Sequence, residues 1–459
     1  MCRCVVGDVR IPTVYIGIHI MQYAVMRVHT IQEKVHIMDK IMSFYMENGL
    51  QVVLNKIPAI KTIITSMWIK QGSQNETSQN NGISHIAEHM VVNKNNRLNP
   101  ELTEHFERLS NAGVNYNATT TKENTYYYFQ GMRESIDMCL DALRITVATN
   151  RKFPSDLLDK ELRIIESEAS SFYSSFNQIN ARIAQALYGN FGVGKVILGT
   201  LKNIKETTLY AVENLVCDTY TPENSVLIIM GDVDYEEDAE KAIKTFQAWE
   251  DRETIKVEES IDNEPGVYFD GAFSGENAIV SIGFRIPYSN ENVRICAELL
   301  SLILSDPVMN GYIPIEVRQR RGLAYNVGGY VNQYKKMCTL GIACASSVNN
   351  IAEVISVSLN EIRKVRENTV DNNALDRAKM TQITRRNIEF ADPLKRTIHL
   401  GKYCSYGRVY SFEDEIRKIR KIDISYFNSV VQQITRTENL GLALVGKADI
   451  DKIVDSLYI

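Results

Sequence analysis

The stretch TPENSVLIIMGDVD, from Thr221 to Asp234, decides how this chain of 459 residues is built, because a related stretch occurs later. That counterpart is TRTENLGLALVGKAD, from Thr435 to Asp449. Gly231 in the first copy matches Gly446 in the second, and a Glu-Asn pair in each copy matches at the same offset along the chain. Such a repeat indicates an internal duplication, so we expect two homologous halves.

The rest of the sequence fits two α+β halves. Strand-like and helical runs alternate from Met42 onward, which predicts in each half a mostly antiparallel sheet packed with helices. We expect the first domain over residues 42–248 and the second over residues 267–459. An acidic run at 249–266, which ends in Pro-Gly, is typical of a surface linker, and residues 1–41 form an N-terminal extension of unclear structure.

Three predicted segments of the first half matter for function. We expect a helix over residues 81–92, and two strands over 114–119 and 125–130 that form a hairpin. A long helical stretch is predicted over residues 155–188, with Ser155 as its N-cap.

Composition narrows the classes of function. With 44% hydrophobic residues the chain can bury a large core, and its net charge of -5 gives no general electrostatic case for nucleic acid or an anionic membrane. The apolar run at 11–26 is short for a membrane span, and no signal-sequence cleavage site follows it. Eight cysteines without paired spacings predict reduced thiols and a cytoplasmic location.

The chemistry is concentrated in GISHIAEHM, residues 82–90, where two of the seven histidines lie four residues apart. On a helix, His85 and His89 share one face, and Glu88 lies beside them. Two imidazoles on adjacent turns can bind one zinc ion, and the glutamate then lies near a water-filled fourth position. This H-x-x-E-H spacing is the inverse of the H-E-x-x-H zinc motif. The alternative is a polar helix face with an accidental spacing.

A catalytic zinc needs a third protein ligand, commonly a carboxylate from another element. Glu161 and Glu168 are seven residues apart, two turns along one helix face, whereas Glu166 lies on a different side. The residues alone leave open which of the two would bind, or whether either is a solvated charge. The corresponding run of the second half, residues 291–306, is apolar and contains no histidine, so the fold alone does not require the motif.

These motifs make the chain resemble the insulinase (pitrilysin) family of zinc metallopeptidases, of the inverzincin type and of short, processing-peptidase-like length. The resemblance covers nearly all of the chain from about Tyr45 onward. The matching motifs are N-G-L-x-V at 48–52, G-S-x-x-E at 72–76, H-x-x-E-H at 85–89, N-A-x-T at 117–120 and R-x-x-x-x-L-x-Y at 318–325. Two departures, Ile86-Ala87 inside the zinc motif and no glycine at 91–94, bear on substrate preference rather than on ligands.

The resemblance implies roles for individual residues of the first domain. Glu168 would be the third ligand beside His85 and His89, with one Zn2+ per chain, and Glu161 would be a supporting catalytic carboxylate. Zinc would lower the pKa of its bound water toward about 7 and polarise the scissile carbonyl. Glu88, as the general base, would take the water proton and return it to the leaving amine.

The resemblance also implies where a substrate binds. Arg318 and Tyr325 would reach across from the second domain and bind the substrate backbone near the scissile bond. The strand around Asn117 and Ala118 would offer a sheet edge to which an extended peptide can add. The two homologous domains would then face each other around a chamber.

The expected function is zinc-dependent endopeptidase activity on extended peptides or unfolded segments. We expect a homodimer, or a heterodimer with a related subunit, and peptides rather than nucleic acids or membranes as partners. Maturation of a leader peptide and general degradation of oligopeptides would use the same site, so the sequence does not rank them. The rival readings are a non-catalytic insulinase-like subunit that binds peptides, and an α+β protein whose histidines are structural.

Overall fold

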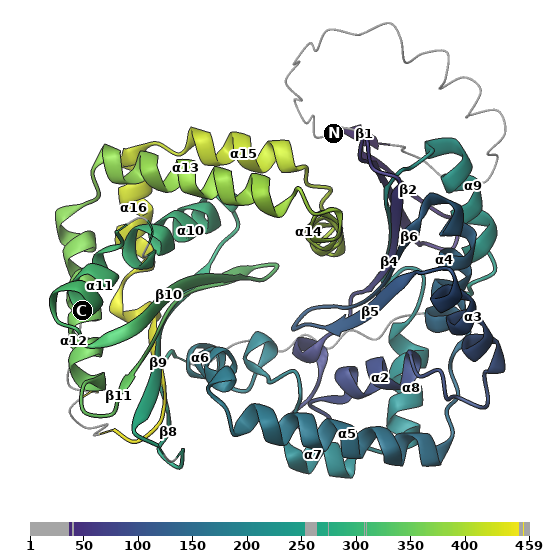
Figure 1. Cartoon of the computed structure of the whole chain (residues 1–459), viewed down its shortest axis with the longest axis horizontal. Helices are drawn as coiled ribbons and strands as arrows, with labels where there is room; N and C mark the ends of the chain where they lie inside the picture. Colours follow the sequence, from purple (N-terminus) through teal and green to yellow (C-terminus); the bar gives the residue numbers. More distant parts are fainter. Residues whose placement is uncertain are drawn as a thin grey trace, which may run out of the picture.

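The computed structural model describes residues 36–38, 41–252, 264–273, 275–306, 308, 310–448 and 453. The predicted extension at 1–41 and the predicted linker at 249–266 therefore lie largely outside the described residues. Two sheets face each other across the molecule, and most helices lie on their outer sides (Figure 1). None of the helices in the described part of the chain has the length and apolar character needed to cross a bilayer.

The first sheet has seven strands in the order β1-β2-β3-β7-β4-β6-β5, and the second has five in the order β10-β11-β9-β12-β8. The strands of the first sheet are β1 (His36–Met38), β2 (Ile41–Tyr45), β3 (Gln51–Lys56), β4 (Thr62–Ile69), β5 (Asn115–Thr120), β6 (Thr125–Met132) and β7 (Ser225–Gly231). Those of the second are β8 (Val267–Asp270), β9 (Asn277–Pro287), β10 (Ala324–Gln333), β11 (Met337–Ser347) and β12 (Leu440–Val445). Neighbours are antiparallel except for β3 with β7 and β8 with β12, so the predicted mostly antiparallel α+β fold is confirmed.

Helices connect the strands in the same order in both halves. Those of the first half are α2 (Ile83–Val91), α3 (Pro100–Asn111), α4 (Ile136–Leu143), α5 (Ser155–Tyr173), α6 (Ile179–Tyr188), α7 (Leu201–Glu206), α8 (Leu209–Thr219) and α9 (Tyr235–Phe246). Those of the second half are α10 (Glu291–Ser305), α11 (Tyr312–Pro314), α12 (Ile351–Asn368), α13 (Asn372–Glu389), α14 (Pro393–Ser405), α15 (Phe412–Lys421) and α16 (Ile424–Ile434). Short 3-10 or π turns complete several connections.

The duplication is visible in these bounds. The repeated apolar stretches form β7 and β12, which begin at Ser225 and Leu440 and are therefore separated by the same offset as the matched glycines of the two copies. Helices α8 and α16 begin at Leu209 and Ile424, again with that offset. The offset read from the sequence is therefore the offset between these two pairs of elements.

One helix of each half packs against the sheet of the other half. Helix α6 follows α5 in the first half, yet its Ile183, Leu187 and Tyr188 join a buried cluster with Ala443 and Val445 of β12. The Tyr188 hydroxyl also lies 2.8 Å from the hydroxyl of Thr339 on β11, within hydrogen-bonding distance. The apolar side of α6 is therefore buried on the second sheet.

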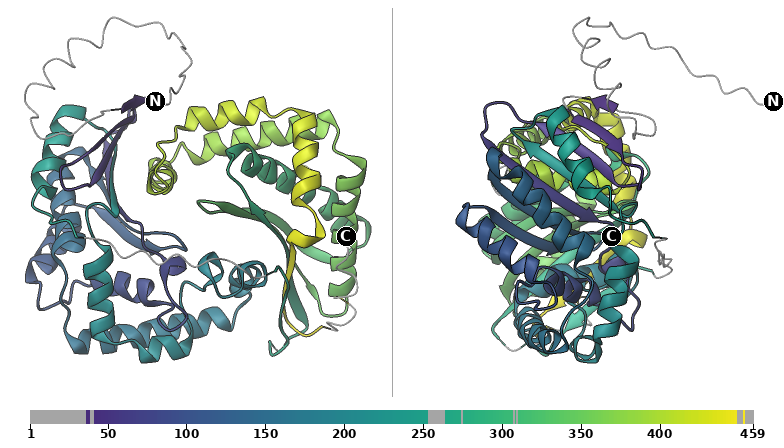
Figure 2. Two further views of the ribbon diagram at one scale, coloured as in Figure 1. Left: turned by 180° about the vertical axis from the view of Figure 1, so that it is seen from behind. Right: turned by 90° about the vertical axis from the view of Figure 1, so that its right-hand side faces the viewer.

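The reciprocal packing involves α14 of the second half. Its Leu400 and Cys404 are buried against Trp68 of β4 and against Val226 and Ile228 of β7. In the front and rear views, α6 and α14 lie between the two halves (Figures 1 and 2). The two helices thus tie the halves together through apolar contacts.

Gly401 of α14 marks the closest approach in this packing. A Cβ built at Gly401 would lie 2.1 Å from Cε2 of the Trp68 ring, so the two backbones and the indole leave no room for a methyl group. We expect Gly401→Ala to lower the free energy of unfolding by about 1–3 kcal/mol, the usual cost of overpacking a core. Thermal unfolding of the whole chain measures this. Gly328→Ala, where a Cβ meets nothing within 4 Å, is the control, and an equal melting temperature for both variants would contradict the packing argument.

The predicted long helix over 155–188 is wrong as one element. Helix α5 ends at Tyr173, and a turn that includes a 3-10 segment (Phe176–Gln178) precedes α6. Ser155 is the first helical residue rather than the N-cap, because Pro154, with an extended backbone, occupies the cap position. The break turns the chain toward the second sheet, which gives α6 an apolar surface to cover. The predicted helix over 81–92 and the predicted hairpin are confirmed as α2 and as β5 paired with β6.

Candidate metal centre

Helix α2 has an apolar side in the core of the first half and a polar side that carries the H-x-x-E-H motif. Its buried apolar side chains are Ile83, Ile86, Ala87, Met90 and Val91. Because side chains three and four residues apart share a helix face, burying these residues turns His85 and His89 together toward α5. The chain enters α2 at Gly82, whose φ of 103° is a left-handed conformation that favours glycine.

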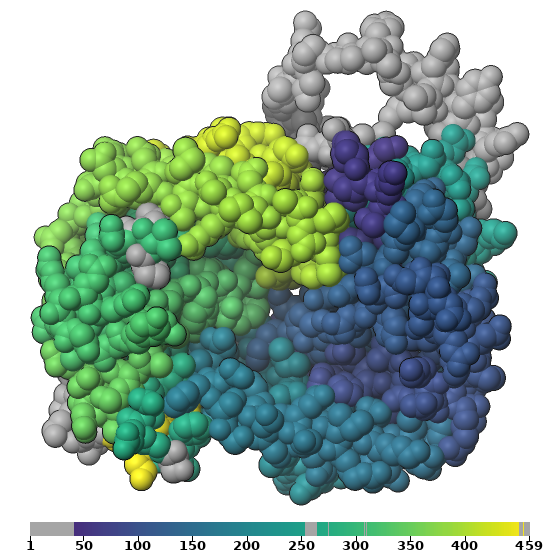
Figure 3. Space-filling view, in the orientation of Figure 1, coloured from purple at the N-terminus to yellow at the C-terminus, as the bar shows by residue number. Residues whose placement is uncertain are grey.

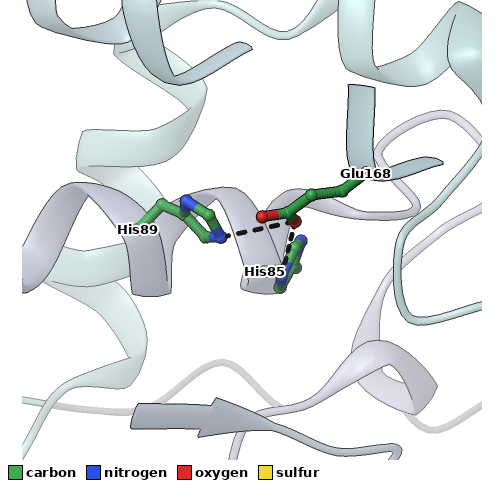
Figure 4. Close-up of side chains that lie close together, drawn as sticks. All are labelled: His85, His89 and Glu168. Atoms are coloured by element: carbon green, nitrogen blue, oxygen red, sulfur yellow. Dashed lines mark ion pairs between the residues drawn. The ribbon is translucent and has the colours of Figure 1, made fainter. Parts of the chain in front are cut away.

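Helix α5 brings the carboxylates predicted from the two-turn spacing. Glu168 Oε2 lies 3.9 Å from His85 Nε2 and 3.8 Å from His89 Nε2. One potential ligand atom from each of the three residues lies within 4.8 Å of the others. Figure 4 shows the carboxylate of Glu168 directed at both imidazoles. The structure therefore brings together the three residues predicted to bind zinc.

The donor set fits a zinc ion. Ligand atoms at the corners of a tetrahedron with bonds of ~2.1 Å are about 3.4 Å apart, slightly less than the separations of 3.8 and 3.9 Å between Glu168 and the two imidazoles. Those separations exceed a hydrogen bond, so the three groups surround a space rather than satisfy one another. The side chains of His85, His89 and Glu168 are 14%, 20% and 44% exposed, which leaves the space open to a ligand from solution.

The protonation of His85 also suits a metal. Burial, followed by the nearby charge of His89, lowers the pKa of the His85 imidazole to about 4. The ring is therefore neutral at ordinary pH and has a lone pair to offer, because a proton does not compete for it.

Glu161 orients His89 rather than facing the space between the three ligands. Its Oε2 lies 3.0 Å from His89 Nδ1, and its Oε1 accepts a hydrogen bond of 2.7 Å from the side-chain amide of Asn93. Burial lowers the pKa of His89, but the hydrogen bond to Glu161 and the charges of Glu168 and Glu88 outweigh it and raise that pKa. With Nδ1 engaged by a carboxylate, Nε2 is left to face Glu168, the arrangement that fixes the tautomer of a metal-binding histidine.

Glu88 is held by Thr120, a residue of the N-A-x-T motif for which the sequence predicted no separate role. The hydroxyl of Thr120, at the end of β5, donates a hydrogen bond of 2.6 Å to Glu88 Oε2. Burial raises the pKa of Glu88, and the bond from Thr120 partly opposes that rise. Thr120 belongs to the N-A-x-T motif, and Asn93 follows the metal-binding helix, so only contacts across 32 and 68 residues reveal their roles.

Asn117 and Ala118 lie on β5, the last strand of the first sheet. Their antiparallel neighbour is β6, and no described strand pairs with the other edge of β5. The Ala118 N–H donates to the side-chain oxygen of Asn117, 2.9 Å away, within the strand itself. The edge next to the metal centre is thus available for an added strand.

Arg318 and Tyr325 lie in the second half. Tyr325, on β10, is 77% exposed, and the guanidinium carbon of Arg318 lies 4.9 Å from the centre of its ring. Within the described part of the chain, no hydrogen bond or ion pair joins either residue to the three candidate ligands. Their predicted approach to the scissile bond therefore stays a prediction.

Comparisons with known proteins match this arrangement. The family model for insulinase (peptidase family M16) matches residues 51–201, and that for the peptidase M16 inactive domain matches residues 208–382. An uncharacterized zinc protease of Bacillus subtilis is 24% identical over 87% of this chain and 96% of its own length. A mitochondrial-processing peptidase subunit beta of Neurospora crassa is 28% identical over 44% of this chain and 42% of its own length.

Solved structures share the fold. A protease from Helicobacter pylori superposes with a TM-score of 0.78 at 17% identity, covering 89% of this chain and 99% of its own. A putative M16-like peptidase from Alicyclobacillus acidocaldarius has a TM-score of 0.75 at 19% identity, covering 92% of this chain and all of its own (100%). The two family models together span both halves, and the zinc motif lies within the first of them. The chain belongs to the insulinase family of zinc metallopeptidases.

Proposed function

We propose that the protein is a zinc-dependent endopeptidase that hydrolyses peptide bonds in extended peptides or unfolded segments. The observation that supports this most directly is the convergence of His85, His89 and Glu168, with Glu88 beside them and anchored by Thr120. A structural metal site is usually closed by four protein ligands, whereas a catalytic one has three and an open position. The relatives named zinc proteases support the same class of reaction.

Different residues of the chain would have different roles in the hydrolysis. Bound zinc supplies a Lewis acid that polarises the scissile carbonyl and makes water acidic. Glu88 accepts the proton of the attacking water and returns it to the amine that leaves. Thr120 fixes the carboxylate of Glu88 by its hydrogen bond, and Glu161 fixes the ring of His89. Glu161 thus acts by orienting a ligand.

The surroundings support an extended peptide as substrate. A peptide that adds to the free edge of β5 would form backbone hydrogen bonds at Asn117 and Ala118, which do not depend on its side chains. The space-filling view is hollowed where the two halves meet (Figure 3). We place Arg318 and Tyr325 on the wall opposite β5, where they would contact the substrate backbone. A segment must be unfolded to lie along a strand edge in such a space.

The test is a digestion of an unstructured peptide mixture, with the products read by mass spectrometry. We expect internal cleavage by the zinc-loaded protein, no cleavage after removal of the metal with a chelator, and recovery when zinc is restored. A compact folded domain should resist cleavage, and the same domain after unfolding should be cut. Zinc-loaded protein that binds these peptides and cuts none of them would instead establish the non-catalytic, peptide-binding subunit.

We extend the proposal to assembly and location. A related subunit or a second copy would be the partner, since one relative is itself named as a subunit of a processing peptidase. The free cysteines of the described residues support a reducing compartment such as the cytoplasm; they are Cys139, Cys217, Cys296, Cys338, Cys344 and Cys404. Leader-peptide maturation and general oligopeptide degradation both fit this site.

A further inference from the structure

A buried carboxylate lies at the start of the metal-binding helix and has no part in the chemistry described above. Glu76 is 1% exposed and lies in the segment that leads into α2. A buried carboxylate is costly unless hydrogen bonds satisfy it, so its partners indicate its role.

Those partners are the first donors of α2. The Gly82 N–H donates to Glu76 Oε2 at 2.7 Å, and the Ser84 N–H donates to Oε1 at 2.8 Å. The side-chain amide of Asn81 donates to Oε2 at 2.7 Å. The first N–H groups of a helix have no partner within it, and Gly82, at the cap position, has no side chain to supply one. Glu76 therefore supplies the cap from a separate segment.

Two lysines, Lys195 buried and Lys122 partly buried, fix the backbone around Glu76. The Lys195 ammonium donates to the backbone carbonyl of Glu76, and the Lys122 ammonium donates to the backbone carbonyl of Lys195. Lys122 belongs to the turn between β5 and β6, whose carbonyls at Thr121 and Lys122 accept from the N–H groups of Ser73 and Gln74 at 3.2 and 2.8 Å. Burial lowers the pKa of Lys122 to about 8, and the negative charge of Glu76 partly opposes this.

The cap that Glu76 provides for α2 lies directly before His85, the first candidate zinc ligand along the chain. Ser84, whose N–H is held by Glu76, is followed directly by His85, and Glu88 and His89 lie one turn further along. The second half has no need of such a cap, because the equivalent α10 begins at its own Asn290 cap and carries no histidine. A shift or fraying of the first turn of α2 would move His85 relative to Glu168 on α5.

We propose that Glu76 is a positioning residue for the metal centre: its carboxylate caps α2 from outside and fixes the turn on which His85 approaches Glu168. This rests on the proposed zinc site. Negative charge near a helix N-terminus is favourable, and two oxygens accepting three N–H donors define the direction as well as the position of the first turn. Glu76 thus acts on the ion through the helix, without touching it.

Glu76→Gln tests the idea with little change of volume. A glutamine has one acceptor oxygen, and its NH2 group would face an N–H donor at the other position, so one side of the cap is lost. We expect the affinity for zinc, measured by competition with a chromogenic chelator, to fall about 10- to 100-fold, the effect typical of groups that support ligands. The visible absorption of the Co2+-loaded protein should also change, and hydrogen exchange should speed up in α2 while β9 stays as in the wild type.

The controls separate the possible outcomes. Glu107→Gln removes the same charge from the exposed side of α3 and should leave zinc affinity and the cobalt spectrum unchanged. If Glu76→Gln does not fold, Asn81→Ala, which removes one of the three donors, should give a smaller loss of affinity. A folded variant at either position with wild-type zinc affinity, cobalt spectrum and exchange in α2 would overturn the proposal. A wild-type protein that binds no zinc would instead overturn the proposed function.

Discussion

Glu88→Gln should abolish measurable peptide cleavage and leave zinc in place. The carboxylate is not among the three groups that surround the metal space, and a glutamine oxygen can still accept the hydrogen bond from Thr120. What is lost is the ability to take a proton from water, a contribution of about 10²- to 10⁴-fold for a positioned general base. We therefore expect kcat to fall by at least that range with KM nearly unchanged.

The measurement pairs metal analysis with peptide turnover in the same preparation. Glu166→Gln is the matched control, because Glu166 lies on α5 but outside the set of groups that face the metal space. That variant should retain both zinc and activity. Undiminished turnover by fully zinc-loaded Glu88→Gln protein would show that another group serves as the base.

His89→Ala should remove the metal itself. The substitution deletes one of three candidate ligands and also leaves Glu161 without the imidazole that it holds at 3.0 Å. Changes to groups that merely support a ligand cost about 10- to 100-fold in metal affinity, so loss of the ligand should cost more than 100-fold. Cleavage should vanish with the metal, while the fold, which buries the other face of α2, should persist.

Equilibrium dialysis against zinc followed by elemental analysis measures this. His105→Ala, on the neighbouring α3, removes a histidine outside the site and should bind about one zinc per chain. Circular dichroism of both variants checks that they are folded. Zinc bound to His89→Ala with the affinity of the wild type would place the metal elsewhere, and the histidines of α2 would then be structural.

The centre of the site was predictable because its spacing is local. Residues four apart on a helix must share a face, and Glu161 and Glu168, seven apart, must share one as well. Periodicity could not assign their separate roles. The resemblance to the family implied those roles, and the structure places Glu168 facing both imidazoles and Glu161 behind His89.

The supporting groups were not predictable by the same reasoning. Thr120, Asn93 and Glu76 act through contacts with other segments, which the spacing of residues along one helix or strand does not reveal. Glu76 and Thr120 did lie in matched motifs, G-S-x-x-E and N-A-x-T, but a motif gives the type of a residue and not the contacts that its side chain makes. The hydrogen bonds to Gly82 and Ser84 become visible only when the loop is folded against the helix.

The fold, like the site, was predictable from the sequence only in part. The shared offset of the repeated stretches predicted the two halves, and β7 with β12 and α8 with α16 begin at that same offset. The break between α5 and α6 was missed because the helical pattern continues on both sides of it. Nor does an apolar helix face specify which sheet will cover it, so the packing of α6 on the second sheet had to be observed.

The exchange of α6 and α14 has a consequence for the ancestry of the molecule. Because each helix covers the sheet of the opposite repeat, a single repeat on its own would leave one sheet face bare and one apolar helix without a partner. Two copies related by a two-fold axis would satisfy both, which is the geometry of a domain-swapped homodimer. Within the described residues, the two halves share this reciprocal packing but not the histidine pair, which α2 carries and the equivalent α10 lacks.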